Sequence, residues 1–370
     1  MKKSGLKLKT WALIFICLLF FTPTVLKVGA FSPALTITAG DKRYVFYYPQ
    51  IDYGLYGTTL KGQSSVVERI CADCDVDPID AILQFNPNND NPFTVQAGKF
   101  GKKIDKQKLI ADIAHALNAG ITSVTARFIK CEPKYTKAQL LKQTALRSQF
   151  TTQFPYSSPA RKHNIALACS LINGCIVEPN ECFSFNERVG ERSEDRGFLP
   201  ANIIVNGEFV SGIGGGVCQV SSTLYNAALT AGLTVTESYR HSLLVDYIEP
   251  SFDAMVSYGA CDLKFKNTTQ SPIYISATAS SSQLTIKIYG LKREYEYERV
   301  WNCLEVIKAT TEEVEWAEGL KESLAHDGLI SEGFLKIYKN GNLIEIKKLR
   351  HDVYAAKNGI KFKSSNQSSQ

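Results

Sequence analysis

The sequence predicts an α+β protein built from several regions. Hydrophobic residues make up 44% and aromatic residues 11% of the 370 positions, which is typical of chains that fold around a core. Several segments repeat their apolar residues with a helical period, while many short segments alternate as strands do. We therefore expect a small α+β domain near the N-terminus, a mixed α/β domain in the middle and a C-terminal β-hairpin extension.

The first thirty residues are typical of an export segment. Five lysines and no acidic residue occur there, an apolar run extends from Trp11 to Phe21, and Val28-Gly29-Ala30 supplies small residues for cleavage. Thr22 to Leu26 lengthen the run to about sixteen residues, near the lower limit for a membrane span. The sequence thus predicts an exported protein with residues 1–30 as a signal peptide or an N-terminal membrane anchor.

Nearly all of the net positive charge of the chain comes from that segment. The formal net charge is +6, and removing the five N-terminal lysines leaves +1. No later basic stripe is interleaved with aromatic residues, so nucleic acid is not an expected partner.

Residues 31–145 are predicted to form the first α+β domain. Alternating residues predict a strand within 31–50, helices are expected over 65–73 and 106–119, and further strands over 80–85 and 121–129. Asp105 and Gly120 are typical of the start and end of the second helix. No cluster of His, Cys and carboxylate residues occurs here, so we expect binding or spacing and no chemistry. A third amphipathic segment is expected over 136–150.

The middle region, 155–290, begins with short strands and many glycines. Asn206-Gly207 predicts a two-residue hairpin turn. A helix is expected over 217–231 with Gly232 as its stop, followed by strands over 233–237 and 242–248. In the extension, 291–370, residues 335–346 read as a hairpin turning at Asn340-Gly341, and the polar tail 364–370 is expected to be disordered.

The nine cysteines that follow the export segment do not match a metal template. Cys71 and Cys74 have a C-x-x-C spacing, but no second pair or His-x-x-x-His follows. An odd number of cysteines outside the cell leaves at least one thiol unpaired or in an intermolecular bond. We expect no metal site.

The stretch GIGGGVCQVSS, residues 212–222, places Cys218 in the first turn of the predicted helix. Unpaired amides and the helix dipole stabilise a thiolate there and lower a cysteine pKa. Gly215 and Gly216 would let backbone amides approach a bound group, as an oxyanion hole requires. The alternatives are a phosphate loop, for which no Lys-Ser/Thr pair follows, and simple packing with Cys218 as a small apolar residue.

His241 is the candidate base for Cys218. It follows the predicted helix by one strand, which is an order that lets a thiol and an imidazole meet. Asp253 and Asp262 are the candidates to orient its ring, although an aspartate beside a turn is often a local cap. A purely structural histidine is the alternative. Flanking side chains predict further substrate contacts: Ser222, Tyr225 and Arg240.

Residues from about 161 to 290 resemble the VanW-like family. The motifs that carry the resemblance are Phe183-Ser184-Phe185-Asn186, Gly214 to Ser221, Thr223 to Asn226, Arg240-His241-Ser242, Asp253-Ala254 and Asp262 to Asn267. More weakly, residues 31–145 resemble a peptidoglycan-binding domain that often precedes it. Some members of the VanW-like family are understood to be L,D-transpeptidases that cross-link peptidoglycan through a cysteine.

The resemblance implies a cell-wall protein acting on peptidoglycan stem peptides. Carried onto this chain, it implies Cys218 as the nucleophile and His241 as the base of a cysteine L,D-transpeptidase. The residue pattern adds Asp253 as a candidate to orient His241 and the amides of Gly215 and Gly216 as candidates to bind the oxyanion. No cofactor is implied, and the expected partner is peptidoglycan. The alternative is a non-catalytic peptidoglycan-binding or vancomycin-resistance-associated accessory protein at the outer face of the membrane or in the wall.

Overall fold

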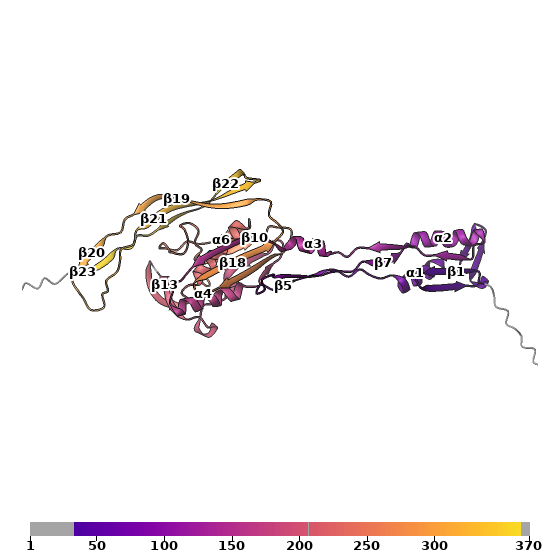
Figure 1. Cartoon of the computed structure of the whole chain (residues 1–370), viewed down its shortest axis with the longest axis horizontal. Coiled ribbons are helices and arrows are strands. Elements are labelled where there is room, and N and C mark those ends of the chain that lie inside the picture. Colours follow the sequence, from indigo (N-terminus) through magenta and orange to yellow (C-terminus); the bar gives the residue numbers. More distant parts are fainter. Residues whose placement is uncertain (1–32, 206, 364–370) are drawn as a thin grey trace, which may run out of the picture. The chain divides into compact units, whose positions relative to one another are not determined.

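The computed structural model describes residues 33–205 and 207–363, which divide into two compact units (Figure 1). One unit holds the described residues up to Val76 together with Lys102–Lys130, and the other holds Asp77–Gly101 and the chain from Cys131 onward. Helices account for 22% and strands for 42% of the structure, which confirms the α+β class. The predicted export segment and polar tail lie outside the described residues.

The first unit packs two helices on a three-stranded sheet. β1 (Leu35–Ala39) pairs antiparallel with β2 (Lys42–Phe46) and parallel with β8 (Ser123–Thr125). The core lies between this sheet and the helices α1 (Gln63–Cys74) and α2 (Lys106–Ala119). The smaller elements are η1 (Tyr48–Gln50), the pair β3 (Ile51–Gly54) and β4 (Gly57–Leu60), and the pair β7 (Gly101–Ile104) and β9 (Phe128–Cys131).

Both predicted helices of this unit are confirmed. Asp105 caps α2 by accepting a hydrogen bond from the Lys108 backbone N–H at 3.0 Å, and Gly120 ends it in the left-handed conformation. Leu109 and Ile113 are fully buried because the 3.6-residue period places them on one face. The predicted strand 121–129 is in fact two short strands, β8 and β9.

The second unit begins with an aromatic hairpin. β5 (Ile82–Phe85) pairs with β6 (Phe93–Gln96), and the Phe93 ring lies edge-on to Tyr274 and Tyr289 with centroids 5.2 Å away in both cases. The predicted amphipathic segment 136–150 is only partly helical. It contains α3 (Lys137–Leu141) and η2 (Lys142–Thr144), but from Ala145 the chain is a strand, because it pairs antiparallel with a strand of the central sheet, β18 (Gln283–Gly290).

A four-stranded antiparallel sheet forms the centre of this unit. Its order is β10 (Ala145–Gln153), β18 (Gln283–Gly290), β17 (Ile273–Ala279) and β11 (Ile176–Val177). Two helices pack against it, α4 (Pro159–Ile172) and α6 (Val217–Thr230). Sequence analysis missed α4, which Ser158 caps through the Arg161 N–H and which has Pro159 at its first position.

Smaller elements surround the two helices. β12 (Cys182–Ser184), β16 (Lys264–Lys266) and β15 (Thr234–Glu237) form a three-stranded sheet, and β13 (Pro200–Val205) and β14 (Glu208–Ile213) form the predicted hairpin. The short helices are α5 (Phe185–Val189) and η3 (Glu194–Arg196). The predicted strand over 242–248 is wrong: this segment consists of bends, turns and irregular chain and pairs with no strand.

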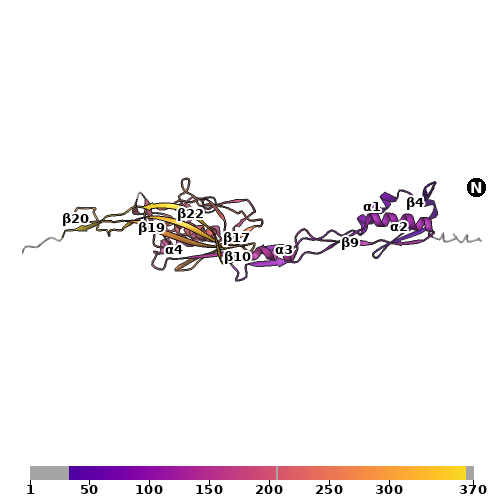
Figure 2. The same ribbon diagram turned by 90° about the horizontal axis from the view of Figure 1, so that it is seen from above.

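The C-terminal extension adds a long antiparallel sheet of β19 (Glu296–Ile307), β21 (Gly328–Lys339) and β22 (Asn342–Tyr354). The predicted turn at Asn340-Gly341 joins the last two strands. In Figure 2, β19 and β22 run alongside the central sheet, and α6 touches both β10 and β19. This explains why almost every α6 side chain is buried. A parallel pair, β20 (Thr311–Val314) and β23 (Gly359–Phe362), completes the fold.

Candidate active site

The glycine turn that opens α6 is shaped by packing on three sides. Gly216 is the residue before the helix and has φ of 106°, a conformation that L side chains rarely adopt. A Cβ there would lie 2.9 Å from Arg161 Cγ, and a Cβ on Gly215 would lie 2.6 Å from the Asn202 carbonyl oxygen. The glycines are therefore needed for close packing. Gly216 also offers no side-chain oxygen to cap the first amides of α6.

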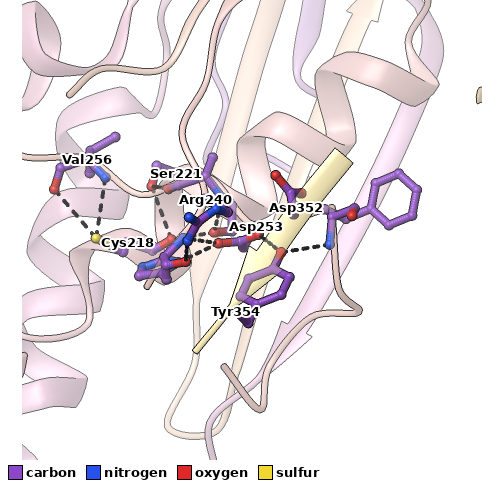
Figure 3. Close-up of polar contacts among 12 residues, drawn as sticks. Cys218, Ser221, Arg240, Asp253, Val256, Asp352 and Tyr354 are labelled. Atoms are coloured by element: carbon purple, nitrogen blue, oxygen red, sulfur yellow. Dashed lines mark hydrogen bonds and ion pairs between the residues drawn. The ribbon is translucent and has the colours of Figure 1, made fainter. Parts of the chain in front are cut away.

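Cys218 occupies the second position of α6 and is half-buried. Its Sγ lies 3.5 Å from both the backbone nitrogen and the carbonyl oxygen of Val256, as Figure 3 shows. Burial opposes ionisation of the thiol, but the interactions with the His241 side chain and with the Val256 backbone outweigh it. The pKa of Cys218 is thus lowered from its ordinary value.

His241 and Asp253 form a buried pair on the loop beyond β15. The Tyr239–Met255 bridge draws the two arms of this loop together, with Met255 N–H donating to the Tyr239 carbonyl at 2.7 Å. Asp253 Oδ2 then lies 2.7 Å from His241 Nδ1 and accepts the His241 backbone N–H at 2.6 Å. Because Nδ1 is engaged, Nε2 is the ring nitrogen that remains for the thiol.

The charges of this pair stabilise one another. Burial opposes the imidazolium, but the hydrogen bond to Asp253 and the interaction with Cys218 raise the pKa of His241 to about 9. Burial likewise opposes the carboxylate, but His241 and Arg350 lower the pKa of Asp253 to about 2. These directions favour a thiolate beside an imidazolium at neutral pH.

The C-terminal extension supplies two further partners of Asp253. Arg350 Nη2 donates to Asp253 Oδ1 at 2.8 Å, and its Nη1 donates to the Asp253 carbonyl at 2.8 Å. The Tyr354 hydroxyl donates to Asp253 Oδ1 at 2.7 Å, as Figure 3 shows. Arg350 also forms an ion pair with Asp352 at 3.0 Å. Sequence analysis missed these residues. Their alternation along β22, at positions 350, 352 and 354, was the available signal that they share one face.

The other predicted site residues lie in different surroundings. Ser222 is fully buried: its hydroxyl donates to the Cys218 carbonyl at 2.7 Å and accepts the Ala254 N–H at 2.9 Å. Tyr225 is 2% exposed, and its ring lies 5.6 Å from the Arg350 guanidinium. Both side chains are therefore buried against residues of the site. Arg240 is exposed, and its Nη1 donates to the His241 carbonyl at 2.9 Å.

Asp262, the second candidate for orienting His241, lies elsewhere. Its Oδ2 accepts the Ser184 hydroxyl, and its Oδ1 accepts the backbone N–H groups of Asn186 and Leu263 at 2.9 and 2.8 Å. It therefore serves the start of α5. Of the two aspartates, the structure brings Asp253 to His241.

Two arginines that sequence analysis did not select flank the thiol. Arg161 comes from α4 and Arg192 from the loop after α5, and the charge of each interacts with Cys218. Their aliphatic stems pack against Gly214 and Gly216, where a larger residue would collide with them.

No metal site or membrane-spanning helix is found in the described part of the chain. Within 33–205 and 207–363, no three His, Cys, Asp or Glu residues are placed to hold a metal ion. No helix in those ranges is both long and apolar enough to cross a membrane. The nine cysteines described are all free thiols, and Cys169 is buried in the core.

Comparison with known sequences gives two family matches and two relatives. Residues 160–289 match the family of VanW like proteins, and residues 64–126 match a peptidoglycan binding domain. The uncharacterized protein YoaR of Bacillus subtilis (strain 168) is 35% identical over 244 residues, which cover 65% of this chain and 76% of YoaR. The vancomycin B-type resistance protein VanW of Enterococcus faecalis (strain ATCC 700802 / V583) is 28% identical over 145 residues, 38% of this chain and 52% of that protein. No solved structure matches.

Proposed function

The chain belongs to the VanW-like family, and from that premise we propose that it is a cysteine-dependent L,D-transpeptidase acting on peptidoglycan stem peptides. Its two matched domains indicate a cell-wall associated protein with peptidoglycan as partner. The observation that carries the proposal is the Cys218 thiol beside a His241 ring whose Nδ1 is held 2.7 Å from Asp253. A nucleophile, a base and an orienting carboxylate in that order are what acyl transfer requires.

The first half of the proposed reaction acylates the enzyme. The Cys218 thiolate attacks the carbonyl carbon of the L-centre in the donor stem, forming the C–S bond and an oxyanion. The backbone amides of Gly215, Gly216 and Cys218, at the start of α6, receive the oxyanion. Collapse breaks the C–N bond, and the His241 imidazolium gives its proton to the departing amine of the terminal D-residue.

The second half transfers the acyl group. An amine from a neighbouring stem attacks the thioester carbonyl, and the neutral His241 ring takes the proton that this amine loses. The C–S bond then breaks, which restores the thiolate and the imidazolium and completes the cross-link. Asp253 keeps the same ring nitrogen engaged throughout and stabilises the charged ring.

The test is incubation of the purified chain with tetrapeptide muropeptides. We expect cross-linked dimers and a thioester on Cys218, found by mass spectrometry of the intact protein. Cys218→Ala should abolish both while its circular dichroism spectrum stays that of the wild type. As a matched control, Cys182→Ala removes an exposed thiol of the same unit and should leave both products.

Failure of the test would favour the competing function. A wild type that forms neither dimer nor thioester, and whose Cys218 is alkylated no faster than a buried thiol such as Cys169, would be a non-catalytic accessory protein of the wall. Burial raises the pKa of Cys169 to about 12, so the two thiols should differ strongly in rate if Cys218 is a nucleophile.

A further inference from the structure

Two arginine side chains pack against the glycine turn that precedes α6. A Cβ on Gly214 would lie 2.9 Å from Arg192 Cβ, and a Cβ on Gly216 would lie 2.9 Å from Arg161 Cγ. Each aliphatic stem therefore packs against backbone within four residues of Cys218. The positive charge of each guanidinium group also interacts with the negative charge of the Cys218 thiolate.

The two guanidinium groups are held differently. Arg161 donates from Nη1 to the Ser157 hydroxyl at 2.6 Å and from Nη2 to Gln219 Oε1 at 2.8 Å. Arg192 donates from Nη1 to the Gly190 carbonyl at 3.1 Å and lies over the Phe185 ring at 5.7 Å. Its Nη2 is buried and has no hydrogen-bond acceptor among the described residues.

Neither guanidinium has a carboxylate partner in the described ranges. No ion pair with an Asp or Glu forms there at either Arg161 or Arg192, whereas Arg299 has one such partner and Arg350 has two. Asp246 interacts with Arg161, and Asp262 with Arg192, only through longer-range charge. Asp262 already accepts three hydrogen bonds near α5. A partly buried cation with an unused donor is costly, so the site has unsatisfied capacity for an anion.

We propose that Arg192, supported by Arg161, binds the terminal α-carboxylate of the donor stem. This inference rests on the proposed function. In a donor that ends one residue past the scissile bond, the carboxylate carbon is two bonds from the leaving nitrogen, within about 4 Å of the attacked carbonyl carbon. Guanidinium groups bind carboxylates with paired, charge-assisted hydrogen bonds. A donor extended by one more residue presents a neutral amide at that point and loses the contact.

The subsite can be tested without any transpeptidase activity. The probes are iodoacetate, which carries a carboxylate, and iodoacetamide, its neutral analogue, with alkylation of Cys218 followed by peptide mass spectrometry. We expect the rate ratio of iodoacetate to iodoacetamide to fall about tenfold in Arg192→Gln, as loss of a charged hydrogen bond implies, and to be largely kept in Arg192→Lys. Arg188→Gln, an exposed arginine of α5, is the matched control and should keep the wild-type ratio.

A second arm uses the donor itself. A tetrapeptide donor and its C-terminal amide are compared in wild type and in Arg192→Gln. Carboxylate recognition predicts that amidation raises KM in the wild type but not in the variant. If kcat falls equally for both donors in Arg192→Gln, the arginine acts on the oxyanion and the proposal is wrong.

The two arms separate the two proposals. An unchanged iodoacetate ratio in Arg192→Gln overturns the carboxylate subsite even if the wild type makes dimers. Conversely, a wild type that makes no dimer ends the transpeptidase proposal, while the altered alkylation ratio would still identify an anion site beside Cys218.

Discussion

Replacing Asp253 by Asn should raise the pKa of Cys218, so that less of its thiol is ionised at neutral pH. Asp253 Oδ2 lies 2.7 Å from His241 Nδ1, and no other carboxylate of the described residues is bonded to that ring. The amide of Asn carries no charge to stabilise the imidazolium. With His241 less basic, the charge that lowers the pKa of Cys218 is lost as well.

The size of the effect follows from the His241 shift. Its pKa rises from 6.5 to about 9, which corresponds to about 3 kcal/mol of stabilisation of the charged ring at roughly 1.4 kcal/mol per pKa unit. Asp253 and Cys218 share this stabilisation. Removing the carboxylate should therefore raise the midpoint of Cys218 alkylation by about one pH unit or more, and lower the rate on the acidic limb about tenfold.

The assay is the rate of Cys218 alkylation by iodoacetamide from pH 4 to 10. Asp262→Asn is the matched control, because Asp262 is also a buried aspartate with several hydrogen bonds but lies at the start of α5. Both variants should lose stability, and only Asp253→Asn should shift the pH profile. An unshifted profile in Asp253→Asn, or an equal shift in Asp262→Asn, would refute the reasoning.

Three further predictions concern the same unit. The His241 ring should titrate near pH 9 by NMR. Because its pKa is raised on folding, the charged ring stabilises the fold fully below about pH 6.5, and this stabilisation is lost as the pH rises through 9. A midpoint at or below 6.5 would contradict the pairing of His241 with Asp253. Tyr354→Phe removes the hydroxyl that donates to Asp253 and accepts the Ser251 N–H. The free energy of unfolding in urea titrations should therefore fall by about 2–3 kcal/mol. A loss below about 0.5 kcal/mol would contradict the role of this hydroxyl. In the same urea titrations, Gly216→Ala should lower the free energy of unfolding by about 1–3 kcal/mol more than Gly259→Ala does. Both glycines have a positive φ, but only Gly216 lacks room for a Cβ. Equal losses would show that the glycine turn is not tightly packed.

Local signals were sufficient for much of the fold. Asp105 and Gly120 mark the ends of α2, and Asn340-Gly341 marks the turn between β21 and β22, because caps and tight turns depend on a few neighbouring residues. Local signals failed where tertiary pairing overrode periodicity. The segment 145–150 joined the central sheet instead of extending a helix, and the apolar run 242–248 found no strand partner.

The sequence by itself determined that Cys218 lies in the first turn of a helix that follows three glycines, and that His241 follows one strand later. Only the tertiary structure decided that Asp253, and not Asp262, engages the His241 ring, because both aspartates stand near turns and local sequence does not distinguish them. It also brought Arg350 and Tyr354 to the far oxygen of Asp253 from about a hundred residues away. Buried charges need partners, and which partners reach them depends on how the C-terminal sheet packs over α6.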